Sequence, residues 1–217
     1  MSMSMSDAMN ASAPAAGLRL EQLLPGFADP VHDAQQAFRC LLDAMSRPGS
    51  LQSLPFELSA PAGLQPALTA LLLALADRDT PLWLPPGLRS GAAGEHLRFH
   101  AGCPLVSEMG AAQFLMLQNL DALPTLDELR LGDAAYPDRS ATLFIEVPAL
   151  ETGSGPLRQR GPGIQGETRI DVAGWSASSQ AFVQENRRRF PLGVDLVLCA
   201  GRQLLALPRT TLIDWEL

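Results

Sequence analysis

The sequence predicts a single α/β domain in which helices cover a mixed β-sheet, and three observations lead to this prediction. Helical and strand patterns alternate along much of the chain, and paired strand patterns close it. A length of 217 residues suits one domain, and 47% hydrophobic with 18% charged residues is a globular composition. We expect residues 1–28 to be a disordered leader and residues 29–217 to form the domain.

The helices are predicted from apolar spacing and from residues typical of helix ends. Asp29 and Pro30 suit the cap and first turn of a helix whose apolar residues recur along 31–45. The segment 64–76 is apolar nearly all round, which predicts a buried helix. Further helices are predicted at 91–100, at 125–131 with capping-box spacing, and at 176–189.

Strands are predicted where β-forming apolar residues are bounded by turns. Three single strands are expected at 81–84, 113–117 and 141–147. Two hairpins follow, one over 156–170 and one over 194–207. We interpret the glycine-rich turn at 161–163 as the tip of the first hairpin and not as a phosphate cradle, because no helix follows it.

All sixteen basic residues are arginines, so the chain contains no lysine. This excludes chemistry through a lysine Schiff base, including that of pyridoxal phosphate enzymes, and it excludes a Walker-A phosphate loop. An anion would have to be held by arginine, hydroxyls, backbone N–H groups or a metal. The net charge of −7 disfavours broad nucleic-acid binding.

The cysteines and the chain's first residues indicate where the protein works. Cys40, Cys103 and Cys199 are odd in number and far apart, which is typical of free thiols in a reducing cytoplasm. No cysteine or histidine pair has zinc spacing, so no metal site is expected. The first residues lack the basic and apolar regions of a signal peptide, and the apolar stretch 68–76 is too short to span a membrane. We therefore expect a soluble cytoplasmic protein that does not bind membranes.

Arg209, Thr210 and Thr211 follow the last predicted hairpin and form the first candidate site. A guanidinium and two hydroxyls at a strand end suit a phosphate or phosphonate oxygen, since α/β proteins bind ligands at strand ends. Alternatively, Arg209 pairs with Asp195 or Asp214 and the threonines continue an edge strand.

Asp77, Asp79 and Thr80 form the second candidate site, at the end of the predicted buried helix. Carboxylates here face the negative end of the helix dipole and need a partner, which could be magnesium or a ribose hydroxyl. Alternatively, they pair with Arg78 or a distant arginine while Asp79 caps the turn.

Polar residues on two helices complete the candidates. His100, two residues after Arg98, is a candidate base or ligand or a structural histidine. One edge of the first predicted helix carries His32, Gln35, Arg39 and Ser46. This edge could face a ligand, a partner protein or solvent.

Six motifs together resemble those of one bacterial family. In order they are Ala37–Gly49, Leu75–Leu84, Leu97–His100 with Cys103–Val106, Gly161–Ile164, Phe190–Leu196 and Leu205–Thr211. On these motifs the chain resembles the PhnH family, which belongs to the bacterial carbon–phosphorus lyase system of phosphonate metabolism. The resemblance covers residues 30 to 212.

The resemblance implies a homodimeric component of a core complex with the G, I and J subunits in phosphonate catabolism. That complex transfers a phosphonate onto the ribose of ATP and displaces adenine, with ATP and magnesium as candidate substrate of the complex. The implied fold resembles the large domain of pyridoxal phosphate transferases without the cofactor, and catalysis by this chain alone is not expected.

Carried onto the matched motifs, the candidate ligand or interface residues are Arg39, Ser46, Asp77, Asp79, Thr80, Arg98, His100 and Arg209. Arg98 and Arg209 would hold phosphate or phosphonate oxygens, and Asp77 or Asp79 a metal or a ribose hydroxyl. Two alternatives stay open: a stand-alone enzyme that binds nucleotides or phosphate esters through the Arg209–Thr211 site, and a structural scaffold.

Overall fold

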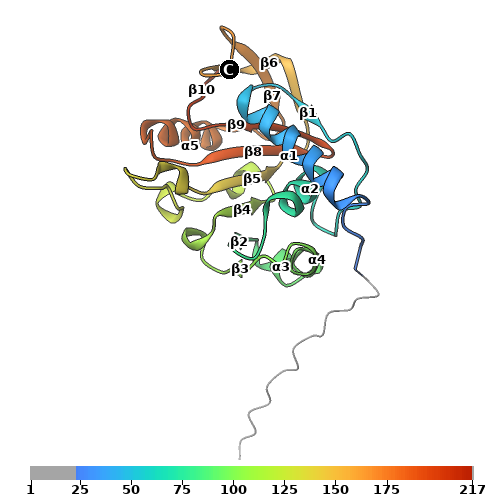
Figure 1. Cartoon of the computed structure of the whole chain (residues 1–217). Coiled ribbons are helices and arrows are strands. Elements are labelled where there is room, and N and C mark those ends of the chain that lie inside the picture. Colours follow the sequence, from blue (N-terminus) through green and yellow to red (C-terminus); the bar gives the residue numbers. More distant parts are fainter. Residues whose placement is uncertain (1–22, 217) are drawn as a thin grey trace, which may run out of the picture.

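The computed structural model describes residues 23–216, which form five α-helices and two β-sheets, with the helices packed mainly on the larger sheet (Figure 1). The helices are α1 (Pro30–Ser46), α2 (Pro66–Leu75), α3 (Pro86–Arg89), α4 (Ala92–His100) and α5 (Ala177–Arg188). Asp29 caps α1 as predicted, because its Oδ1 accepts from the backbone N–H groups of Val31 and His32 at 3.2 and 3.0 Å. Ser176 caps α5 in the same manner.

The larger sheet is mixed, as predicted. Its strands are β1 (Gln52–Ser53), β2 (Leu82–Trp83), β3 (Leu105–Val106), β4 (Phe114–Leu117), β5 (Thr142–Glu146), β8 (Asp195–Ala200) and β9 (Gln203–Leu207). Their spatial order is β1-β9-β8-β5-β4-β2-β3. In this spatial order the strands β8, β5, β4, β2 and β3 are parallel to one another. Strand β9 is antiparallel to both of its neighbours, β1 and β8. The predicted hairpin of β8 and β9 is therefore confirmed.

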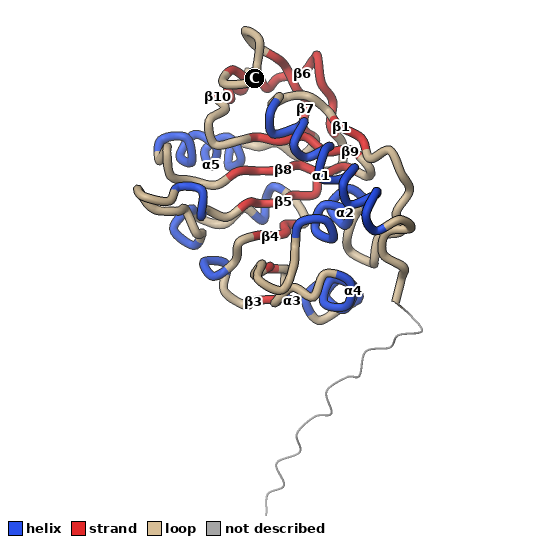
Figure 2. Tube along the Cα trace, in the orientation of Figure 1, coloured by secondary structure: helices blue, strands red, loops and turns tan. Residues whose placement is uncertain are grey.

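A smaller antiparallel sheet lies at one end of the larger one (Figure 2). It consists of β6 (Leu150–Arg160), β7 (Thr168–Val172) and β10 (Leu212–Trp215), in the order β10-β6-β7. The predicted hairpin of β6 and β7 is present, but β6 is longer than expected and its register shifts between Thr152 and Leu157. Gly155 in this bulge has a φ of +112°, and a Cβ there would lie 2.4 Å from the carbonyl oxygen of Ile170, so only glycine fits.

The larger sheet separates two apolar clusters, because alternate residues of a strand point to opposite faces. Phe144 packs on one face with the buried sides of α1, α2 and α4. Leu143 and Ile145 pack on the other face with Phe182 of α5 and with the smaller sheet. Helix α2 is buried along 67–72, which confirms the prediction from its apolar sequence.

Several boundaries differ from the prediction. The helix expected over 125–131 is a single 3₁₀ turn, Leu126–Glu128, although its capping box with Thr125 is present. The strands β1 and β3 and the short helix α3 were not predicted, and β10, an edge strand that begins directly after Thr211, was expected only in the alternative interpretation of that segment. No helix among residues 23–216 is long and apolar enough to cross a membrane.

The expected leader lies outside the described residues as far as residue 22. Residues 23–28, which we assigned to it, pack against the domain: the ring of Phe27 lies 5.8 Å from that of Phe56 in an edge-on contact. Cys103 and Cys199 are buried, Cys40 is half-buried, and all three are free thiols as predicted.

Candidate functional site

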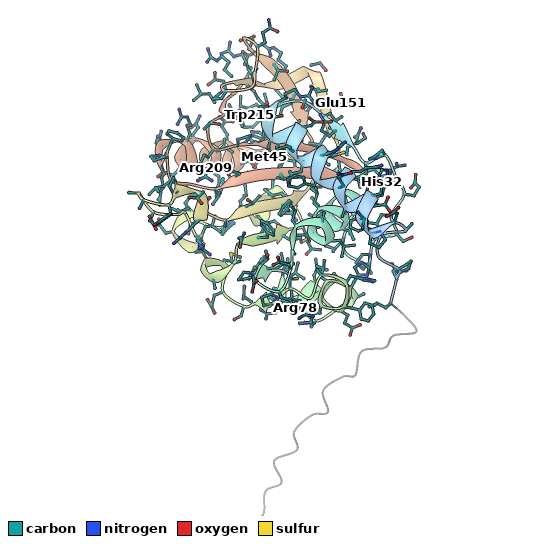
Figure 3. The ribbon with its side chains drawn as sticks, in the orientation of Figure 1. His32, Met45, Arg78, Glu151, Arg209 and Trp215 are labelled. Carbon is teal, nitrogen blue, oxygen red and sulfur yellow. The ribbon has the colours of Figure 1, made fainter. Side chains whose placement is uncertain are left out.

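Arg209 lies just after β9, beside the start of β8 (Figure 3). Its Nε and Nη2 atoms donate to the Asp195 carboxylate at 3.3 and 2.8 Å. Nη2 also donates to Ser140 Oγ at 2.6 Å, and Nη1 donates to the carbonyl oxygens of Pro137 and Pro191 at 2.9 and 3.4 Å. The five N–H groups of the guanidinium thus meet five acceptors, and the predicted alternative of a pair with Asp195 is the one observed.

These contacts do not support the predicted role of Arg209 as a phosphate anchor. Its donors are directed at acceptors of the domain itself, and its side chain is 13% exposed. Thr210 and Thr211 precede β10, an edge strand of the smaller sheet, instead of forming a trio with the guanidinium.

Asp77 caps the tight turn between α2 and β2. Its Oδ1 accepts from the backbone N–H of Asp79 at 2.9 Å and from Thr80 Oγ1 at 2.7 Å. These hydrogen bonds, the one from Thr80 foremost, hold the pKa of Asp77 below its ordinary value. The sequence assigned this capping role to Asp79, and the structure assigns it to Asp77. Figure 3 shows Arg78 of the same turn well apart from Arg209, so the two candidate sites are separate.

The charges of Arg98 and Asp77 both act on the buried thiol of Cys103. Burial raises the pKa of this thiol, Arg98 opposes the rise and Asp77 adds to it. His100, on the same helix as Arg98, has its Nε2 3.0 Å from the carbonyl oxygen of Leu24. His100 therefore ties residues 23–28 to α4, as expected of a structural histidine.

Arg39 and Ser46 are exposed on α1. Ser46 Oγ donates to the carbonyl oxygen of Asp43 at 3.1 Å. Val31, Phe38 and Leu42 of the same helix are 83%, 48% and 55% exposed, which places an apolar stripe on its outer side. The edge of α1 thus presents both polar and apolar groups to its surroundings.

Two of the six motifs, far apart in sequence, meet in space. A Cβ on Gly163 would lie 2.2 Å from the carbonyl oxygen of Ser46, and a Cβ on Gly49 would lie 2.7 Å from Gln159 Oε1. Both glycines have a positive φ, +82° and +83°. Thr152 Oγ1 fixes the junction further by donating to the carbonyl oxygen of Gly49 at 2.8 Å.

We call this junction of residues 46–51, Thr152 and 161–168 the turn–hairpin site. Its surface carries a wide-open hollow of about 470 Å³ whose lining includes Arg47, Glu167 and Thr168. Gln159 is fully buried beside Gly49, and both polar atoms of its amide lack a partner among the described residues. Among the described residues this amide is thus a buried polar group without a partner, and it is not one of the residues that line the hollow.

Glu146 is a buried polar residue that the sequence analysis did not single out. It ends β5, and its Oε1 accepts from the backbone N–H of Gln65 at 2.6 Å, at the start of α2. Burial raises the pKa of this carboxyl, and the hydrogen bond from Gln65 opposes the rise. The sequence signal that could have identified Glu146 is its position, as an acidic residue at the end of a strand of β-forming residues.

Among residues 23–216, no group of three or more histidine, cysteine or acidic side chains is placed to hold a metal ion. The larger mixed sheet and the smaller antiparallel sheet beside it define an α/β protein in which two glycine turns join the end of α1 to the β6–β7 hairpin. A family model described as "Bacterial phosphonate metabolism protein (PhnH)" matches residues 25–214. The chain belongs to this family.

Two relatives are similar over most of their length. The chain is 42% identical over 190 residues, 88% of this chain and 94% of the relative, to "Alpha-D-ribose 1-methylphosphonate 5-triphosphate synthase subunit PhnH" of Rhizobium meliloti (strain 1021). It is 34% identical over 184 residues, 83% of this chain and 85% of the relative, to "Putative C-P lyase subunit protein HtxG" of Stutzerimonas stutzeri.

Proposed function

We propose that this chain is a component of a bacterial complex that transfers a phosphonate onto the ribose of ATP and displaces adenine, as an early step of phosphonate catabolism. The observation that carries the proposal is the 42% identity, over 94% of its length, to a relative named as part of such a synthase. The partners we propose are the G, I and J subunits and a second copy of this chain, in the cytoplasm.

The apolar stripe on α1 supports a role in assembly. Val31, Phe38 and Leu42 are large apolar side chains exposed along one helix. Contiguous exposed apolar surface marks sites of protein association in soluble proteins. The reacting groups of ATP and of the phosphonate would then be handled by the complex, and the chain alone would show no turnover.

Growth on methylphosphonate tests the proposed function. A strain that lacks its own PhnH protein, but keeps the other components, should grow on methylphosphonate as phosphorus source when this chain is expressed. Affinity-tagged chain should also recover the G, I and J subunits at low salt. Equal growth of all strains on inorganic phosphate is the control. Absence of growth on methylphosphonate, with soluble chain present, would refute the proposal.

We also propose that the fold resembles the large domain of pyridoxal phosphate transferases and that the chain nevertheless does not use this cofactor. The order of the larger sheet, with one antiparallel strand beside a parallel series, supports a scaffold of α/β type. The residues do not fit the cofactor, because the chain contains no lysine to form the covalent bond.

The purified protein should therefore be colourless, and added pyridoxal phosphate should leave its visible absorbance equal to that of the free cofactor. Reaction at the N-terminal amine is the one exception, because it is the remaining primary amine. Borohydride reduction followed by peptide mass spectrometry separates the two cases. An adduct on any internal peptide would contradict this prediction.

A further inference from the structure

A hollow of about 280 Å³ lies between the last turns of α5 and the start of β10. Its lining includes Gln184, Arg187 and Arg188 from the helix, and Thr211 and Asp214 from the C-terminal segment. This hollow is distinct from the turn–hairpin site and shares no lining residue with it.

Two of the residues that line this hollow each carry a polar atom that is buried without a partner among residues 23–216. Thr211 is 6% exposed, and its Oγ1 has no hydrogen-bond partner there. Arg187 Nε is likewise buried and unpaired. Buried donors in folded proteins are nearly always hydrogen-bonded, and those that face a hollow find their partners in water or in a ligand.

The charge in the hollow is positive. Within the described part of the chain, Arg187 has no carboxylate within ion-pair distance, and its guanidinium lies 4.9 Å from the ring centre of Phe190. Arg188 makes an exposed contact with Glu185 at 3.4 Å. The acid in the lining, Asp214, accepts from Arg160 at 2.7 Å and lies 3.5 Å from Arg158. The negative charge of Asp214 is therefore paired with arginines of β6 and not with Arg187 or Arg188 of α5.

We propose that this hollow binds an oxyanion of the phosphate or phosphonate type, with Arg187 and Thr211 as its ligands. An arginine fork and a hydroxyl are donors that suit such an anion, and stacking on Phe190 holds the guanidinium in place. The sequence analysis predicted an anion site that combined Thr211 with Arg209. In the structure the donors of Arg209 are hydrogen-bonded within the domain, and Thr211 lines the hollow beside Arg187 instead. The proposal rests on contacts within this chain and is independent of membership in the complex.

Calorimetric titration of the full chain tests the proposal, with inorganic phosphate and methylphosphonate as separate probes. We expect saturable binding of at least one probe, and the comparison shows whether the site prefers phosphate or phosphonate. Arg187→Gln should weaken binding about tenfold or more, since it removes a charge-assisted contact. Thr211→Val, which keeps the shape of the side chain, should weaken it severalfold, and Thr211→Ser should retain it.

Arg139→Gln is the matched control, because Arg139 is likewise stacked on an aromatic ring, 3.9 Å above Tyr136, but lies outside the hollow. Its binding should equal that of the parent. Melting curves without ligand show that each variant is folded, and phosphate should raise the Tm of the parent more than that of Arg187→Gln. No saturable binding of either probe, or equal binding by the parent and Arg187→Gln, overturns the proposal.

Discussion

Replacing Arg209 with alanine should lower the free energy of unfolding by about 3 kcal/mol. The side chain links the ends of several segments, because its guanidinium contacts Asp195 of β8, Ser140 before β5 and the carbonyl oxygen of Pro137. The side chains of Arg209 and Asp195 are only 13% and 17% exposed. Removing one partner leaves the other charge largely buried and unpaired, which is the costly way to break an ion pair.

Denaturant unfolding of the parent, Arg209→Ala, Asp195→Asn and the double variant measures this coupling. The loss of unfolding free energy in the double variant should be smaller than the sum of the losses in the two single variants. Arg160→Ala is the matched control. The side chains of Arg160 and Asp214 are 48% and 45% exposed, so losing this ion pair should lower the free energy of unfolding by under about 1 kcal/mol. If Arg209→Ala costs no more than this control, the structural role assigned to Arg209 is wrong.

The sequence predicted the elements whose signals are local. Helix α1 carries its own cap at Asp29 and its own apolar spacing, and the β8–β9 hairpin carries its own turn at 201–202. The strands β1 and β3 are two residues long and exist because a neighbouring strand pairs with them. So short a segment has no periodicity to detect. The 3₁₀ turn over 126–128 has the cap of a longer helix, but the chain does not continue it.

The candidate site was harder to predict because its partners are distant in sequence. The sequence placed Arg209 at a strand end and offered Asp195 as one partner, yet the other acceptors, Ser140 and Pro137, come from a segment about seventy residues earlier. The contact of Gly163 with Ser46 joins two motifs that the sequence treated separately. A motif in the sequence identifies candidate residues, but the fold determines which of these residues come into contact.

Acidification from pH 6.5 to pH 4 should lower the free energy of unfolding through His96. This histidine is 1% exposed, and neither ring nitrogen has a hydrogen-bond partner among residues 23–216. Burial lowers its pKa from 6.5 to about 4, and the neighbouring His100, whose ring centre is 4.4 Å away, adds to the effect. His96 and Glu95 both line a hollow of about 210 Å³ between α4 and residues 23–24, but Glu95 does not bond to the ring.

The direction follows from proton binding by the two states. Below pH 6.5 the unfolded chain protonates this histidine, whereas the folded chain keeps it neutral until about pH 4. The unfolded state therefore gains protons first, and stability present above pH 6.5 is lost progressively down to pH 4. A pKa difference of this size corresponds to a loss of about 3 kcal/mol.

Unfolding free energies of the parent and of His96→Leu, measured at several pH values between 7 and 4, isolate this contribution from that of the carboxyl groups. His96→Leu should be nearly as stable as the parent at pH 7, because it removes two unpaired nitrogens together with the ring, and it should be the more stable protein at pH 4. His32→Gln, at an exposed position of α1, should keep the parent's pH dependence. A loss on acidification that is equal in the parent and His96→Leu would show that this histidine is already protonated, or solvated, in the native protein.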